Sequence, residues 1–168
     1  LEFRRVLFRS AFGTGMHETT QLCIRQLKKY VTEDTEILDV GCGSGILGML
    51  ALKFGAKHSV GTDLDPCAID ATYENMDNNG ISRDQYEVMI GNIIDDKAVQ
   101  DKVGYEKYDI VAANILADVL VPLTPVIIHQ MKKRRYLYHE WNHRRQRRCG
   151  SRSCEGGRSG SPGSQSPG

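Results

Sequence analysis

Residues 38–48 read LDVGCGSGILG, and this stretch decides the fold. The apolar run at residues 35–40 predicts a short buried strand, and residues 44–55 predict a helix that ends at the C-cap glycine Gly55. Gly41 and Gly43 lie between the two elements and Gly45 is at the start of the helix, where a tight turn must join strand and helix. Such a turn lets a nucleotide or nucleoside ligand lie close to the backbone at the start of the helix.

Strands and helices alternate on both sides of this stretch. Residues 19–30 and 66–80 predict helices, and residues 58–64, 86–91 and 107–114 predict strands. The apolar residues after position 114 predict a further helix that is interrupted by Pro122 and Pro125. The expected fold class is therefore α/β, a Rossmann-like doubly wound and mainly parallel sheet that is incomplete after its fourth strand.

The glycines fit two different ligand-binding patterns. Gly43, Gly45 and Gly48 match the dinucleotide pattern G-x-G-x-x-G, but this pattern is weak alone and places Gly48 inside the helix. Asp39, Gly41, Gly43 and Gly45 form the other pattern, an acid at the strand end followed by alternating glycines. A carboxylate there would repel a pyrophosphate and favour the ammonium and sulfonium groups of S-adenosyl-L-methionine, so we expect that cofactor.

Polar residues also follow the next two predicted strands. Asp63 ends the second strand, where an acid can accept both ribose hydroxyls of either cofactor class. A helix N-cap is the structural alternative for Asp63, although Asp65, directly before Pro66, suits that role better. Asn92 follows the third strand and is expected to touch the adenine, with a turn-forming Asn as the alternative.

Four segments together carry a family resemblance. FGTGMHETT (12–20), LDVGCGSGILG (38–48), GTDLDP (61–66) and VAANILADVL (111–120) resemble the ribosomal protein L11 methyltransferase (PrmA) family of class I methyltransferases. The resemblance covers residues 11–133. It implies methyl transfer from S-adenosyl-L-methionine to lysine side chains and the α-amine of a large-subunit ribosomal protein. It places cofactor-binding residues at Thr20, Gly41, Asp63 and Asn114.

Asn114 is the expected catalytic residue. It follows the fourth strand, where its carbonyl oxygen can accept hydrogens of a substrate amine and direct the lone pair toward the methyl group. The segment NILA departs from the N-P-P-Y form of other amine methyltransferases, so Phe12 is the candidate for an aromatic wall. Thr20 binds cofactor in one interpretation and caps a helix in the other, and His17 is more simply structural than a general base.

Charge and cysteine content limit the partners. Residues 1–10, 11–133 and 134–168 carry net charges of +2, −7 and +6, which add to the +1 of the whole chain. The acidic middle argues against nucleic-acid binding. Five cysteines without paired spacing indicate free thiols, no metal site and a cytoplasmic protein, and no apolar run has the length of a membrane span. We expect a monomer.

The two ends of the chain differ in character from the methyltransferase domain at residues 11–133. Residues 1–10 are interpreted as a non-native leader. Residues 134–168 are expected to be disordered and to arise from a changed reading frame. Synonymous codons for residues 134–158, read one base later, can spell GGIYITSGIIDDREDAVAEAVKAAG, a turn, a strand and an amphipathic helix. A genuine basic tail that binds RNA is the alternative.

Three other functions stay open on the sequence. They are a methyltransferase that acts on RNA or a small molecule, an NAD-dependent oxidoreductase, and a basic-tailed RNA-binding module without enzymatic activity. The resemblance also implies an N-terminal substrate-recognition domain, which residues 1–168 do not contain. We therefore expect this chain to be a poorly active fragment.

Overall fold

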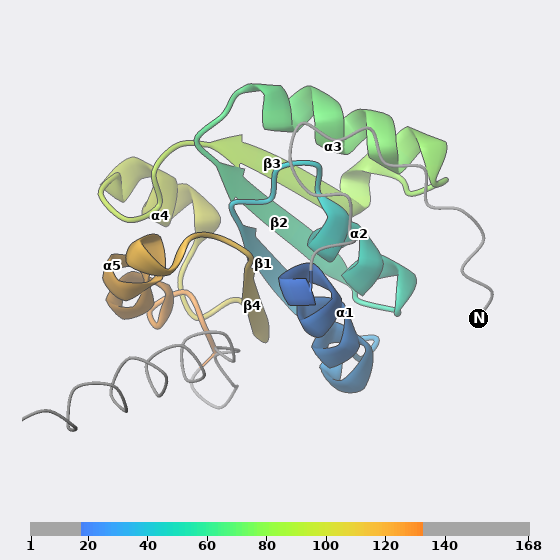
Figure 1. Cartoon of the computed structure of the whole chain (residues 1–168), viewed down its shortest axis with the longest axis horizontal. Helices are drawn as coiled ribbons and strands as arrows, with labels where there is room; N and C mark the ends of the chain where they lie inside the picture. The colour runs from blue at the N-terminus through green and yellow to red at the C-terminus, as the bar shows by residue number, and fades with distance from the viewer. Residues whose placement is uncertain (1–17, 133–168) are drawn as a thin grey trace, which may run out of the picture. The chain divides into compact units, whose positions relative to one another are not determined.

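Four parallel strands form one sheet in the computed structural model, which describes residues 18–132 (Figure 1). The sheet has the order β3-β2-β1-β4. Its strands are β1 (Glu36–Val40), β2 (His58–Asp63), β3 (Tyr86–Ile90) and β4 (Ile110–Ala113). Leu38 of β1 lies opposite Val60 of β2 and Val111 of β4, so three strands run in step and end at one edge of the sheet.

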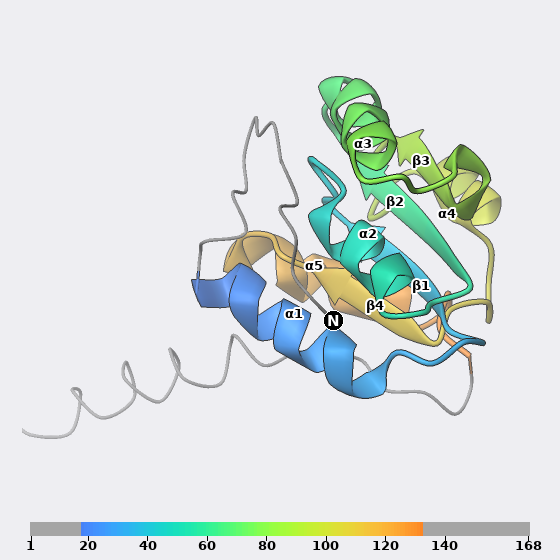
Figure 2. The same cartoon turned by 90° about the vertical axis from the view of Figure 1, so that its right-hand side faces the viewer.

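Helices cover both faces of the sheet, as Figure 2 shows from the side. One face carries α1 (Glu18–Tyr30), α2 (Ile46–Lys53) and α3 (Cys67–Asn78), and the other carries α4 (Lys97–Val103) and α5 (Ala117–Ile127). A short 3₁₀ turn, Arg83–Gln85, precedes β3. The predicted doubly wound, parallel α/β arrangement is confirmed for these residues.

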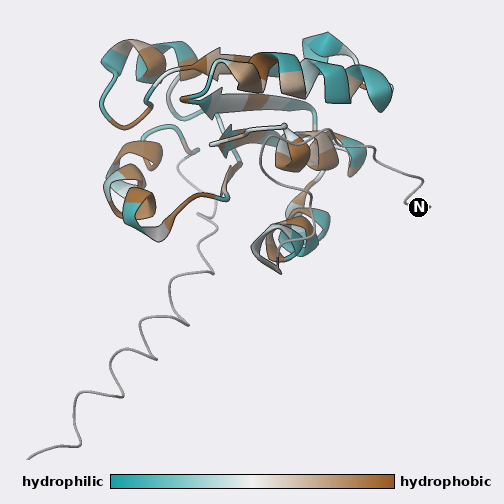
Figure 3. Cartoon of the chain, turned by 45° about the horizontal axis from the view of Figure 1, so that its top comes forward, coloured by the Kyte–Doolittle hydropathy of each residue, from teal (hydrophilic) through white to brown (hydrophobic). Residues whose placement is uncertain are grey.

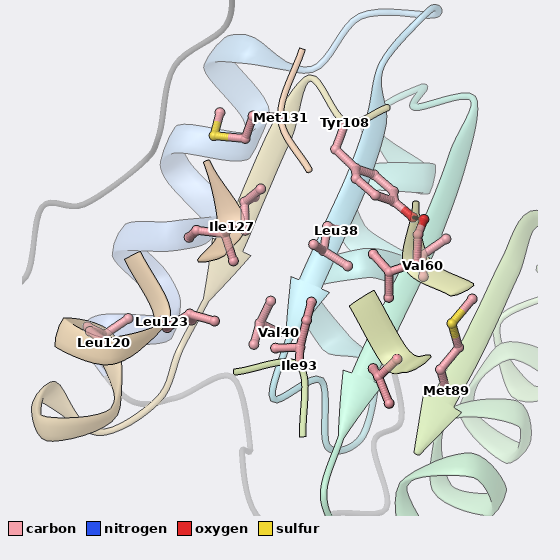
Figure 4. Packing of buried hydrophobic residues seen from close by; sticks show 13 residues of the cluster. Leu38, Val40, Val60, Met89, Ile93, Tyr108, Leu120, Leu123, Ile127 and Met131 are labelled. Atoms are coloured by element: carbon pink, nitrogen blue, oxygen red, sulfur yellow. Dashed lines mark hydrogen bonds between the residues drawn. The ribbon is translucent and has the colours of Figure 1, made fainter. Parts of the chain in front are cut away.

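The core lies between the sheet and its helices. On the α4 and α5 side, Leu38, Val60 and Met89 of the strands belong to one buried cluster with Leu123 and Ile127 of α5 (Figure 4). On the other side a second cluster joins α1 and α2 to β1, and a third joins α2 and α3 to β3. Strands buried on both faces read as continuous apolar runs, which is why the sequence located them.

One expected break in the chain is absent. Pro122 and Pro125 were predicted to interrupt the last helix, but α5 continues through both of them. Its buried residues Leu120, Leu123 and Ile127 pack on the sheet, and this burial outweighs the backbone hydrogen bonds that two prolines remove. The helix is drawn mostly brown in Figure 3, since apolar side chains such as the exposed Val121 also lie on its outer side.

One prediction of a helix cap is wrong, one is confirmed, and one helix was missed. Thr20 lies within α1 and does not cap it. Helix α3 begins at Cys67, and the carboxylate of Asp65 accepts the N–H of that residue at 2.9 Å, as predicted for Asp65. The missed helix, α4, follows Asp96, whose side chain accepts two N–H groups of its first turn.

The predictions for residues 1–10, Phe12, His17 and 134–168 lie outside the described residues. In residues 18–132 no helix has both the length and the apolar character needed to cross a membrane. The last described residues return to the sheet, where Met131 forms a parallel bridge with Tyr108, just before β4.

Candidate functional site

A cavity of about 430 Å³ lies at the carboxyl ends of all four strands. It is lined by residues that directly end or follow each strand: Val40 and Gly41, Asp63 and Leu64, Gly91 and Asn92, Asn114 and Ile115. Ligands of open parallel sheets bind at this edge, and the volume falls within the range of small-molecule sites. Five residues predicted from the sequence line this cavity: Gly41, Gly43, Asp63, Asn92 and Asn114.

The glycine turn forms one wall of the cavity. Gly41, Gly43 and Gly45 have φ values of 70°, 53° and 76°, a left-handed conformation that side chains rarely adopt. A Cβ atom on Gly41 would also lie 2.4 Å from a methyl carbon of Ile115. The turn therefore needs glycine at these positions. Gly41 and Gly43 line the cavity, whereas Gly45 does not.

Asp63 holds the turn and faces the cavity. One carboxylate oxygen accepts the N–H of Gly43 at 2.7 Å, and the other accepts the N–H of Asp65 at 2.9 Å. Asp63 is half-buried and is not an N-cap of α3. A carboxylate has about four lone-pair sites, so each oxygen can accept one further hydrogen, which suits a ribose diol.

Asp39 does not lie where the sequence argument placed it. Its carboxylate is 1 % exposed, does not line the cavity, and accepts the N–H of Gly48 at 3.0 Å and the hydroxyl of Tyr86 at 3.1 Å. Burial raises the pKa of Asp39 to about 6, while these two hydrogen bonds oppose the rise. The negative charge that a ligand meets is therefore that of Asp63, which suits the ribose of either cofactor class. The expected repulsion of a pyrophosphate by Asp39 is not supported, because the Asp39 carboxylate does not face the cavity.

Asn114 and Thr20 are brought together from opposite ends of the described chain. The amide nitrogen of Asn114 donates a hydrogen bond of 2.8 Å to the hydroxyl of Thr20 in α1. Thr20 is 1 % exposed and does not line the cavity, whereas Asn114 is exposed at its edge. Thr20 therefore fixes the orientation of Asn114, and the carbonyl oxygen of that side chain is the group turned away from Thr20.

Asn92 forms the turn that the alternative interpretation predicted, and it also lies at the cavity. It lines the cavity, and its side-chain oxygen accepts the N–H of Ile94 at 3.0 Å while its amide nitrogen donates to Asp95 at 2.9 Å. The turn is thus shaped by Asn92 itself. Cys42 is buried beneath the glycine turn, and burial raises the pKa of its thiol far above the ordinary value, which fits a packing role.

Sequence reasoning missed the apolar part of the site. Ile93, Ile94 and Ile115 line the cavity with the more exposed Leu116 and Val119 of the α5 region. In a sequence, apolar residues next to strand ends look like residues of the hydrophobic core, so no sequence signal distinguished cavity-lining residues from core residues. A second, smaller cavity of about 150 Å³ lies between α1 and β4, and its walls include Cys23, Leu27, Tyr30 and Ile110. It is away from the glycine turn and from Asp63.

The sequence is similar to that of known proteins of one family. Residues 10–139 match the family described as "Ribosomal protein L11 methyltransferase (PrmA)". A curated relative of that name from Lachnospira eligens is 63 % identical over 127 residues, which cover 76 % of this chain and 40 % of the relative. The chain thus spans about two fifths of that protein's length.

Solved structures give the same result for the fold. The ribosomal protein L11 methylase of Lactobacillus delbrueckii subsp. bulgaricus has a TM-score of 0.64 and 31 % identity, covering 76 % of this chain and 61 % of that one. A TehB-like SAM-dependent methyltransferase of Corynebacterium glutamicum has a TM-score of 0.53 and 21 % identity, covering 68 % and 59 %. The latter likeness concerns the fold alone.

Proposed function

Because the chain belongs to the ribosomal protein L11 methyltransferase (PrmA) family, we propose that its strand-end cavity binds S-adenosyl-L-methionine for protein methylation. The acceptors in this proposal are amino groups of a large-subunit ribosomal protein, both lysine side chains and the α-amine. One observation carries it: a single cavity contains Asp63, the glycine turn and Asn114.

The residues present fit this cofactor. Asp63 offers a carboxylate oxygen to each ribose hydroxyl, and Ile93, Leu116 and Val119 offer apolar surface to an adenine. The glycine turn lets the methionyl part approach the backbone closely. When bound, the cofactor supplies a methyl group on a positively charged sulfur, and the carboxylate of Asp63 is compatible with that charge.

Asn114 orients the amine that accepts the methyl group. A lysine ammonium has no lone pair, so the amine must lose a proton before it attacks. The Asn114 amide nitrogen is held by Thr20, which leaves the carbonyl oxygen to accept an N–H of the neutral amine. Catalysis then rests mainly on alignment and on exclusion of water.

Two other enzymatic functions fit less well. An NAD-dependent oxidoreductase is disfavoured because the chain belongs to a methyltransferase family. Asp63 and Gly48 do not decide between the two cofactors, since an acid after the second strand and a glycine packed within the first helix also occur in dinucleotide sites. An RNA substrate would have to bind residues 11–133, and their net charge of −7 would repel its phosphates. A cytoplasmic, monomeric enzyme that modifies a protein is the interpretation we favour.

Calorimetric titration with S-adenosyl-L-methionine, and separately with NAD, tests the cofactor. We expect saturable binding of S-adenosyl-L-methionine, no binding of NAD, and loss of binding in Asp63→Ala. Asp34→Ala removes an exposed carboxylate at the other end of β1 and should bind as the unaltered chain does. Binding of NAD, or equal binding by Asp63→Ala, would overturn the proposal.

Mass spectrometry of the ribosomal protein tests the acceptor. Incubation of that protein with the chain and S-adenosyl-L-methionine should add 14 Da increments, about the mass of one CH₂ group, to lysine and N-terminal peptides. Turnover is expected to be low for this chain. Methyl groups found on ribosomal RNA, with none on the protein, would favour the RNA alternative.

A further inference from the structure

Helix α2 starts without a capping side chain of its own. Its N-cap residue is Gly45, no side chain accepts a hydrogen bond there, and its first turn holds no acidic residue. The first N–H groups of a helix nevertheless need acceptors. For Gly48 the acceptor comes from the sheet below, since its N–H donates to a carboxylate oxygen of Asp39 in β1.

Tyr86 donates to the same oxygen of Asp39. It comes from β3 and is fully buried, with its hydroxyl 3.1 Å from the carboxylate. The ring fills the space that side chains at two glycines would need: a Cβ atom on Gly48 would lie 2.5 Å from the ring carbon Cζ, and one on Gly61 3.0 Å from Cε2. The glycine at position 48 thus makes room for the tyrosine, which explains the partial likeness to a dinucleotide pattern.

We propose that Asp39, Gly48 and Tyr86 form a positioning unit that holds the glycine turn, residues 41–45, in its ligand-binding shape. The turn begins two residues after Asp39 and ends three residues before Gly48, so the bond from Gly48 to Asp39 joins the helix after the turn to the strand before it. The three left-handed glycines of the turn can adopt other conformations, and this bond acts with those from Gly43 to Asp63 and from Gly41 to Thr62 to hold one of them. None of the three residues lines the cavity, so they act through the turn.

The charge state of Asp39 matters to this unit. The titratable groups that affect its carboxyl group come from four segments: Tyr86 of β3, Asp63 of β2, Cys42 of the turn and Cys23 of α1. Burial disfavours the carboxylate, and the hydrogen bonds from Gly48 and Tyr86 favour it. At neutral pH the carboxylate accepts both bonds, and removal of the tyrosine hydroxyl should raise the pKa of Asp39.

Replacement of the tyrosine hydroxyl tests the unit. In Tyr86→Phe we expect a higher pKa of Asp39 in a carboxyl ¹³C NMR titration. Hydrogen exchange at the Gly48 amide should become about tenfold faster, and S-adenosyl-L-methionine should bind about tenfold more weakly at pH 7.5, as loss of one hydrogen bond to a charged group predicts. Tyr105→Phe is the matched control, because it removes a hydroxyl that donates to Asp101 on the surface; all three readouts should stay unchanged.

The cofactor-binding measurement rests on the proposed function, whereas the Asp39 titration and the Gly48 exchange do not, so failure of the unit and failure of the proposed function can be distinguished. If the unaltered chain binds no S-adenosyl-L-methionine, the proposed function fails, while the Asp39 titration and Gly48 exchange still judge the unit. Unchanged exchange and titration in a folded Tyr86→Phe would overturn the unit. If circular dichroism shows that Tyr86→Phe is unfolded, Asp39→Asn is measured in its place. Hydrogen exchange at the Gly48 amide of Asp39→Asn that keeps the pH dependence of the unaltered chain would also overturn the proposed unit.

Discussion

The carboxyl group of Asp39 is buried away from water in the folded chain. This burial lowers the free energy of unfolding at pH values where the group is charged. The pKa of Asp39 is about 6 in the folded chain and near the ordinary aspartate value of 3.8 when the chain is unfolded. Between these values the folded state holds more protons than the unfolded state, so the contribution of Asp39 to stability falls as pH rises from 4 to 6, by roughly 3 kcal/mol.

Asp39→Asn should remove this pH dependence. In urea unfolding at pH 4 to 8, the free energy of unfolding of the variant relative to the unaltered chain should rise through the window from pH 4 to 6. Asp34→Asn, at an exposed position, should show no such rise. Parallel curves for Asp39→Asn and the unaltered chain would show that the carboxylate is not buried as described.

Thr20 contributes through its hydrogen bond to Asn114 rather than through a cap. Thr20→Val keeps the shape of the side chain and removes the acceptor of that 2.8 Å bond. We expect a loss of about 1 kcal/mol in the free energy of unfolding, measured by urea titration. Thr19→Val changes the neighbouring residue of the same helix and is expected to cost less; equal losses would count against the assigned bond.

At the scale of elements, Gly48 tests how closely α2 packs on the sheet. A Cβ atom there would lie 2.4 Å from the Ser59 hydroxyl oxygen, and it would also overlap Tyr86. We expect Gly48→Ala to lower the free energy of unfolding by about 2 kcal/mol through overpacking, although alanine favours helix. The measurement is chemical denaturation of the variant beside the unaltered chain.

Gly55→Ala gives a useful comparison. Gly55 has a φ of 105°, which strains any other residue, but nothing lies within 4 Å of a Cβ atom there. Gly55→Ala should lower the free energy of unfolding less than Gly48→Ala does, on the order of 1 kcal/mol. A larger loss at Gly55 than at Gly48 would mean that backbone strain, and not the contact with Tyr86, explains the glycine pattern.

The elements also show how far sequence reasoning reaches. All four strands and the strand-end positions of Asp63, Asn92 and Asn114 were predictable, because buried parallel strands leave continuous apolar runs and end at one edge. Helix α4 was missed because it has only seven residues and its cap, Asp96, resembles a polar loop. The burial of Asp39 was not predictable, since its partner Tyr86 lies 47 positions away in the sequence.

In the molecule as a whole, β4 is one of the two edge strands of the described sheet, and its free edge can pair with a further strand. The chain leaves α5 and returns to the start of this strand. There Lys132 donates its N–H to the carbonyl oxygen of Tyr108, and its ammonium group pairs with Asp109 at 2.8 Å. A parallel continuation from this point would run along β4.

We propose that the residues after 133 derive from a changed reading frame, as the sequence predicts. In the shifted reading a Gly-Gly turn and then the strand IYIT follow this return, whereas the sequence from Arg134 is basic. Sequencing of the encoding DNA should reveal one base gained or lost near codon 134. Restoration of the frame should raise the midpoint of thermal unfolding and reduce aggregation; unbroken DNA in frame with relatives would contradict the proposal.

Amide NMR spectra recorded during titration with S-adenosyl-L-methionine would locate the bound cofactor. We expect the largest chemical-shift changes at Gly41, Gly43, Asp63, Asn92 and Asn114, at the carboxyl ends of all four strands. The amide signals of residues at the smaller cavity between α1 and β4, such as Cys23 and Tyr30, should not change. Changes confined to that smaller cavity, or no changes in a folded chain, would show that the cofactor does not bind at the strand ends.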